Sequence, residues 1–221
     1  MAISVIDQRC LSGMLIFVAD EIARREADLN ALDAAVGDGD HGITMRIGFE
    51  AIRERLGQLD PATPIDGILR ESGTAFLGAT GGAIGVVMGK MLMAGGKALQ
   101  GMQEIRAQEF QQLLTAMESS VAATGKVKPG DRTILDAIHA AAVAATAPGW
   151  ASKDLNTIVD LAASAAQGAA RTTADMLCRV GRASRLGNRV LGHPDPGAIS
   201  FGIILRAMHH WITISAPGSH S

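Results

Sequence analysis

The chain favours helix along almost its whole length, and this preference constrains its fold more than any other feature. Alanine, leucine and methionine dominate, runs of β-branched residues are rare, and no strand-like alternation of any length occurs. Glycine and proline divide the sequence into about eight helical segments. The predicted segments are residues 4–27, 42–57, 65–78, 83–99, 107–124, 133–147, 152–178 and 197–215. We therefore predict an all-α fold, with residues 1–221 in a single domain because no linker or internal repeat interrupts them.

Composition excludes several classes of function. The net charge is −2 and aromatic residues make up 3% of the chain, so a nucleic-acid surface is not expected. No apolar run approaches the length of about 20 residues that a membrane span requires. The N-terminus lacks a basic segment followed by an apolar core, so no signal peptide is expected. Two cysteines far apart in sequence form no ligand spacing, which indicates a reducing, cytoplasmic setting.

Three aspartates, Asp33, Asp38 and Asp40, lie within eight residues of one another. Carboxylates this close repel each other, and burying them is costly unless a cation neutralises them. Three glycines in the same stretch allow the backbone to fold tightly enough for all three side chains to point at one spot. Ligands that are all oxygen favour a hard cation, so the stretch predicts a site for Mg²⁺ shared with phosphate oxygens.

This stretch has a second interpretation. A Gly-Asp-Gly-Asp run is also typical of a solvated turn, in which Asp40 caps the following helix. An EF-hand calcium loop does not fit, because counting from Asp38 puts Phe49 at the twelfth position, where that loop needs an oxygen ligand.

Residues 78–85 read Gly-Ala-Thr-Gly-Gly-Ala-Ile-Gly and lead into a predicted helix. Amides freed by small residues, together with the positive end of a helix dipole, can hold a phosphate group. The segment is not a Walker A loop, and it is not a dinucleotide fingerprint because no strand precedes it. The alternative is close packing between helices through Gly81, Gly85 and Gly89.

Residues 181–197 carry three arginines and end in Pro-Asp-Pro-Gly. The guanidinium groups of Arg182, Arg185 and Arg189 suit anionic oxygens. Long segments of this chemistry are often functional, although a solvated basic loop is the alternative. An acidic metal cluster, a glycine cradle and an arginine segment are together what phosphoryl transfer requires.

Four motifs, in this order, resemble the ADP-binding L subunit of dihydroxyacetone kinase. They are Asp33-x4-Asp38-Gly39-Asp40-His41-Gly42, then Gly81-Gly82-Ala83-x-Gly85, then Pro129-Gly130-Asp131-Arg132-Thr133, and finally Gly181-Arg182-Ala183-Ser184 through Gly192-His193-x-Asp195-Pro196-Gly197-Ala198. The motifs cover nearly the whole chain, and the last one is long and specific.

The resemblance implies an all-α barrel of eight antiparallel helices, with the nucleotide held by loops at one end. It implies that Asp33, Asp38 and Asp40 ligate a pair of Mg²⁺ ions that bridge the phosphates of ADP or ATP, and that Arg182 is the catalytic residue. By the same match, the nucleotide site comprises His41, Gly42, Ile43, Thr44, Ala83, Ile84, Gly125, Thr133, Arg182, Asp195, Pro196 and Gly197.

The resemblance also implies a partner, because the family holds its ketone substrate on a separate K subunit or domain. This chain is expected to transfer a phosphoryl group to dihydroxyacetone, or a related ketose, on a K-type partner. In stand-alone bacterial versions an M subunit of the phosphotransferase system rephosphorylates bound ADP, and that donor is expected here. The alternatives are an ATP-dependent kinase subunit for another ketose and a nucleotide-binding regulatory partner without turnover. The oligomeric state stays open, with a homodimer as one alternative.

Four positions depart from the family pattern. The family usually has serine where this chain has Ile84, proline and leucine where it has Val86 and Val87, and asparagine where it has Thr44. Loss of a hydroxyl removes a hydrogen bond to phosphate of about 1 to 3 kcal/mol. These changes bear on nucleotide retention and on the identity of the ketose.

Overall fold

The computed structural model describes residues 4–149 and 153–215 of the chain. The helices of these residues are α1 (Gln8–Arg24), α2 (Glu26–Ala34), α3 (His41–Leu56), α4 (Ile65–Ala79), α5 (Gly82–Ala98), α6 (Ala107–Gly125), α7 (Ile134–Ala145), α8 (Leu155–Thr172) and α9 (Pro196–Ile214). Two 3-10 helices, η2 (Thr173–Asp175) and η3 (Arg182–Val190), lie between α8 and α9. In this part of the chain we find no helix with the length and apolarity that a membrane span requires.

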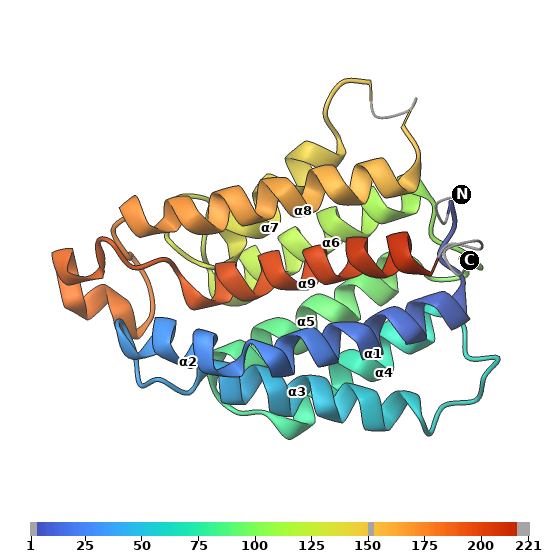
Figure 1. The fold of residues 1–221 in the computed structure, drawn as a ribbon, viewed down its shortest axis with the longest axis horizontal. Helices are drawn as coiled ribbons and strands as arrows, with labels where there is room; N and C mark the ends of the chain where they lie inside the picture. The colour runs from blue at the N-terminus through green and yellow to red at the C-terminus, as the bar shows by residue number, and fades with distance from the viewer. Residues whose placement is uncertain (1–3, 150–152, 216–221) are drawn as a thin grey trace.

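Eight of the described helices form a closed ring. Neighbours along the chain pack side by side from α3 through α9, α1 packs against α3, and α9 closes the ring against α1. The short helix α2 lies outside the ring against α3, at the same end of the molecule as η3 (Figure 1). The prediction of an all-α barrel is therefore confirmed, and the connections on either side of α2 and of η3 meet at one end of it.

The interior of the ring is apolar, which is why the helices close on one another. Phe49 of α3 and Phe76 of α4 meet edge to face, with ring centroids 5.7 Å apart. Helices α4 and α5 approach so closely that a Cβ added at Gly73 would lie 2.5 Å from the carbonyl oxygen of Gly89. Close packing therefore explains Gly89, whereas a Cβ at Gly81 would meet nothing within 4 Å. The packing alternative raised for these glycines does not account for Gly81.

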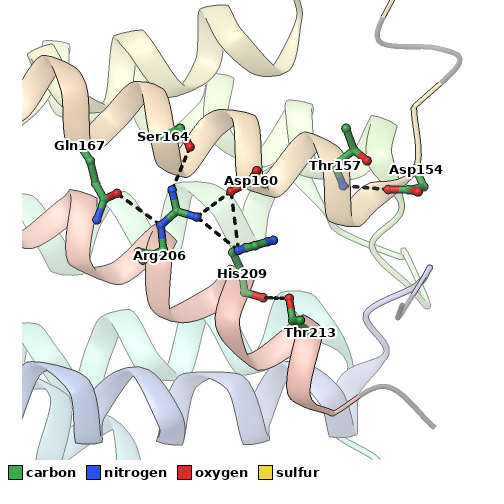
Figure 2. Close-up of polar contacts among 8 residues, drawn as sticks. All are labelled: Asp154, Thr157, Asp160, Ser164, Gln167, Arg206, His209 and Thr213. Atoms are coloured by element: carbon green, nitrogen blue, oxygen red, sulfur yellow. Dashed lines mark hydrogen bonds and ion pairs between the residues drawn. The ribbon is translucent and has the colours of Figure 1, made fainter. Parts of the chain in front are cut away.

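Helices α8 and α9 are joined by a polar network on the outside of the ring (Figure 2). The Arg206 guanidinium donates to Asp160 over 2.6 Å and to Ser164 over 2.8 Å. His209 lies 3.7 Å from the same Asp160 carboxylate, and burial lowers the pKa of this histidine. The network joins α9 to α8, so His209 has a structural role.

The first predicted helix, residues 4–27, is wrong in its bounds. The chain begins its first helix at Gln8, where the Asp7 carboxylate accepts a hydrogen bond from the Cys10 amide over 2.8 Å. The helix breaks at Arg25, whose φ of −102° and ψ of 6° leave the helical range, and α2 follows. No glycine or proline marks this break. Residues 33–41 are therefore not all loop, because Asp33 lies in the last turn of α2.

The last segments differ from prediction in a similar way. Helix α8 begins after Asp154, whose carboxylate accepts from the Thr157 amide over 2.7 Å, and it ends at Thr172 rather than at Cys178. The predicted start at Ser152 lies outside the described residues. The segment 181–197, expected as a loop, carries the 3-10 helix η3, which bends at Gly187 where φ is 55°.

Candidate nucleotide and metal site

The three predicted metal ligands meet at the junction of α2 and α3. Asp33, Asp38 and Asp40 each offer an oxygen atom, and these atoms lie within 4.8 Å of one another. Asp33 is partly buried, whereas Asp38 and Asp40 are exposed. The donor set is entirely carboxylate oxygen, which fits Mg²⁺ or another hard cation.

Local hydrogen bonds hold this junction in shape. The Asp33 carboxylate accepts from the amides of Gly39 over 2.9 Å and Asp40 over 3.1 Å, which folds the chain back on itself. The side chain of Asn30, in α2, accepts from the Ile43 amide in the first turn of α3. Asp40 stands at the capping position of α3, but its side chain makes no capping hydrogen bond. In the solvated-turn interpretation, Asp40 would therefore occupy the capping position without its side chain bonding to the helix, and whether the cluster is a cation site stays a prediction.

A cavity of about 290 Å³ opens beside the carboxylates. The α2–α3 junction, the start of α5, the start of α7 and the segment leading into α9 all contribute to its wall. Of the predicted site residues, those lining it are Asp33, Asp38, His41, Ala83, Ile84, Thr133, Asp195, Pro196 and Gly197. Four segments far apart in the sequence therefore meet around one hollow, as the motifs predict.

The remaining predicted residues, Asp40 among them, lie outside the cavity lining. Gly42, Ile43 and Thr44 form the first turn of α3, directly after the carboxylate cluster. Gly125 is the last residue of α6. Arg182 begins η3 directly after Gly181, which does line the cavity, and its side chain lies outside the described part of the structure.

His41 is a buried, neutral histidine. Its Nε2 lies 2.7 Å from the Ser200 hydroxyl, which in turn donates to the Pro196 carbonyl over 3.0 Å. Because a hydroxyl has one hydrogen, the His41 Nε2–H must be the donor to Ser200. Burial lowers the pKa of His41 to about 4. The contact fixes the start of α3 against the start of α9 and so sets the width of the cavity.

Asp195 caps helix α9 at the edge of the cavity. Its carboxylate accepts from the Ala198 amide over 2.8 Å, and its own amide donates to the Thr173 hydroxyl over 2.8 Å. Desolvation raises the pKa of Asp195 to about 6, against the lowering effect of the Ala198 amide and of Arg132. The carboxylates of Asp136 and Asp33 add to the rise, so negative charge accumulates around the cavity.

The segment before α7 is a rigid turn built on Asp136. This carboxylate accepts from the Gly130 amide over 2.5 Å and from the Thr133 amide over 2.8 Å. The Thr133 hydroxyl accepts from the Leu135 amide, completing a capping box. Thr133 therefore has a structural task as well as a place in the cavity wall.

Sequence reasoning missed several residues of the wall. Most are apolar or small and carry no signal of their own: Val36, Gly37, Val87, Ile134, Cys178, Val180, Gly181 and Ala183. The exception is Arg132, a charged side chain that is 1% exposed and lines the cavity. Its place in the motif Pro129-Gly130-Asp131-Arg132-Thr133 was the available signal.

Comparison with known proteins shows the family to which the chain belongs. The profile of the DAK2 domain matches residues 35–210. The ADP-binding subunit DhaL of the PEP-dependent dihydroxyacetone kinase of Escherichia coli is 32% identical over 180 residues, which are 81% of this chain and 85% of that subunit. L-erythrulose kinase of Pectobacterium atrosepticum is 33% identical over 200 residues, which are 90% of this chain and 34% of that kinase.

A solved structure shows the same fold. The native dihydroxyacetone kinase of C. freundii superposes with a TM-score of 0.71 at 28% identity, over 90% of this chain and 34% of that one. The same enzyme in complex with AMP-PNP and Mg²⁺ gives a TM-score of 0.67 at 28% identity, over 90% of this chain and 33% of that one. This chain thus spans about a third of these larger kinases.

The helical barrel and the site at its end define a protein of the dihydroxyacetone kinase type, and the chain belongs to the DAK2 domain family. Within that family, the predicted resemblance to the L subunit is confirmed by the identity to DhaL over most of both chains.

Proposed function

We propose that this chain, as one domain, is the nucleotide-binding phosphotransferase subunit of a ketose kinase. It binds Mg-ADP or Mg-ATP and transfers the phosphoryl group to dihydroxyacetone, or a related small ketose, held on a separate K-type subunit. One observation carries the proposal: the carboxylate cluster of Asp33, Asp38 and Asp40 borders a cavity that the other motif segments also line. The names of the similar proteins supply the reaction and the substrate class.

In this proposal each part of the cavity has a task. The three aspartates hold Mg²⁺, which neutralises phosphate charge when bound. The start of α5 offers backbone amides and the positive end of its helix dipole to phosphate oxygens, because no side chain of Gly81 or Gly82 obstructs the approach. The apolar side chains Ile84, Val87 and Ile134 exclude water around the nucleotide. The chain positions and neutralises, and supplies no nucleophile.

The phosphoryl donor is proposed to be an M-type protein of the phosphotransferase system that recharges bound ADP. The support is the name of the E. coli relative, which is PEP-dependent and matches 81% of this chain. The alternative, an ATP-dependent kinase subunit for another ketose, is supported by the L-erythrulose kinase. A regulatory partner that binds nucleotide without turnover is the third alternative.

Phosphoryl transfer with a K-type partner separates these alternatives. Gently purified protein is first analysed by native mass spectrometry for bound ADP and Mg²⁺. It is then mixed with a K-type subunit and dihydroxyacetone or erythrulose, and with either ATP or a PEP-driven phosphotransferase system. Co-purified ADP with turnover on PEP supports the proposal, turnover on added ATP alone supports the second alternative, and binding without turnover supports the third. Absence of Mg-nucleotide binding refutes all of them.

Arg182→Ala tests the catalytic assignment in the same assay. We expect transfer to fall by about 10²-fold or more while the melting temperature stays near that of wild type, because the lost cation stabilises charge that develops in transfer. Wild-type turnover in this variant would remove Arg182 from the mechanism.

A further inference from the structure

Arg132 is a buried cation to which the proposed function assigns no role. Its side chain is 1% exposed and lies in the wall of the cavity. Its backbone has a φ of 61°, a left-handed conformation that is uncommon for a residue with a side chain. Such a conformation costs free energy and persists only where the surrounding structure enforces it. Here Arg132 lies in the turn that the Asp136 carboxylate holds, directly before α7.

The guanidinium of Arg132 is poorly satisfied by the protein itself. Its Nη2 donates to the His193 carbonyl over 2.6 Å, and among the described residues this is its one hydrogen bond. Its Nε is buried and has no partner there. No carboxylate of the described residues forms an ion pair with it within 4.0 Å. A guanidinium carries five N–H donors, and a buried Nε–H without an acceptor is costly.

The carboxylates around the same cavity show where the missing partner would lie. Asp33, Asp38 and Asp195 share the cavity wall with Arg132, so carboxylates and a guanidinium border the same hollow. Arg132 also interacts electrostatically with Asp195. An anion bound to a metal on the aspartates would bring acceptors into the hollow that Arg132 lines. The phosphate chain of a nucleotide has that charge and the oxygen acceptors that a guanidinium prefers.

Arg132 also joins two segments of the site. Its bond to the His193 carbonyl, and the bond from the Arg179 amide to the Asp131 carbonyl over 3.4 Å, attach both ends of the η3 segment to the dipeptide 131–132. Movement of Arg132 would therefore move the segment that carries Arg182.

We propose that Arg132 contacts the phosphate chain of the metal-bound nucleotide, as a second cation alongside Arg182. This rests on the proposed function, since it concerns the nucleotide that the cavity is proposed to bind. The contact would give the buried guanidinium the acceptors that the protein does not supply.

The test compares Mg-ADP with adenosine, which lacks phosphate. Affinities for both are measured by calorimetry for wild type, Arg132→Met, Arg132→Lys and the control Arg171→Met, an exposed cation in the last turn of α8. A hydrogen bond to a charged group corresponds to about 10- to 150-fold in affinity. We expect Arg132→Met to lose this factor for Mg-ADP and to keep wild-type affinity for adenosine. Arg132→Lys should lose less affinity for Mg-ADP than Arg132→Met, and Arg171→Met should lose none.

The outcomes separate this inference from the proposed function. Equal affinity of wild type and folded Arg132→Met for Mg-ADP, or an equal loss for Mg-ADP and adenosine, would overturn the phosphate contact alone. If Arg132→Met does not fold, Arg132→Lys decides, since loss of the planar fork must lower affinity for Mg-ADP and not for adenosine. Wild-type protein that does not bind Mg-ADP would overturn both the contact and the proposed function.

Discussion

Replacing Asp40 with asparagine distinguishes a cation site from a plain acidic turn. The exchange preserves shape and helix-capping capacity, but removes one charge from a cluster whose oxygen atoms lie within 4.8 Å of one another. Two unit charges at that limit repel by about 0.9 kcal/mol in water, and by about 3.5 kcal/mol at an effective dielectric constant near 20. Because Asp38 and Asp40 are exposed, the lower figure applies.

In the metal-free protein, Asp40→Asn changes the free energy of unfolding through two opposing contributions. Asp40→Asn removes repulsion with both Asp33 and Asp38, about 2 kcal/mol together. It also removes a favourable interaction of about 0.3 to 1 kcal/mol between the charge and the N-terminus of α3. The remaining stabilisation is about 1 kcal/mol, which raises the melting temperature by about 2 to 4 °C for a chain of this size. In the presence of Mg²⁺ we expect the wild type to melt above Asp40→Asn, because the variant has lost a metal ligand.

The assay is thermal unfolding in EDTA and in millimolar MgCl₂ at matched ionic strength. Glu54→Gln is the control, since Glu54 is an exposed carboxylate of α3 outside the cluster. We expect Asp40→Asn to melt above wild type in EDTA and to gain little from Mg²⁺, while the control follows wild type in both. An equal gain from Mg²⁺ in Asp40→Asn and wild type would refute the metal site.

Three further predictions concern pH, packing and affinity. The pKa of Asp195 is raised from 3.8 to about 6, so between these pH values the folded protein holds a proton that the unfolded chain has lost. The free energy of unfolding should therefore fall as pH rises between about 4 and 6. In urea unfolding, Asp195→Asn should lose less stability over this range, and a pH profile identical to wild type would contradict the shift. Gly73→Ala should destabilise the protein by about 1 to 3 kcal/mol, because its Cβ would lie 2.5 Å from the Gly89 carbonyl oxygen. The control Gly78→Ala, whose Cβ would meet nothing within 4 Å, should leave stability unchanged. Equal urea midpoints for the two variants would contradict the packing argument. Ile84→Ser restores a hydroxyl in the cavity wall and should tighten Mg-ADP binding by about tenfold in calorimetry; unchanged affinity would mean that the hydroxyl does not reach phosphate.

Much of the fold was predictable because helix formation depends on local residue preferences and on glycine and proline. Most predicted segments correspond to single helices, and the capping residues Asp154 and Asp195 stand where helices begin. The break at Arg25 was not predictable, because neither glycine nor proline marks it. What favours the break is tertiary: Leu29 becomes fully buried, and Glu26 pairs with Arg46 of α3.

The candidate site was also predictable only in part. The three aspartates are close in sequence, so their convergence needed only a tight local turn, and the motif resemblance placed the other segments. The motif indicated Arg132 as a candidate, but its burial could not be predicted from the sequence, since the same residue in an exposed turn would be an ordinary solvated cation. Its burial follows from the packing of residues 131–136 against the segment that ends at His193.

By itself the sequence determined the helices, the acidic cluster and the glycine-rich and arginine-bearing segments, because each depends on residues close together in the chain. Only the tertiary structure decided which of these segments share a cavity. His41 and Ser200 are 159 residues apart, and their hydrogen bond exists because α9 returns alongside α1 and α2 to close the ring. Closure depends on burying the apolar faces of all eight barrel helices together, which no single segment specifies.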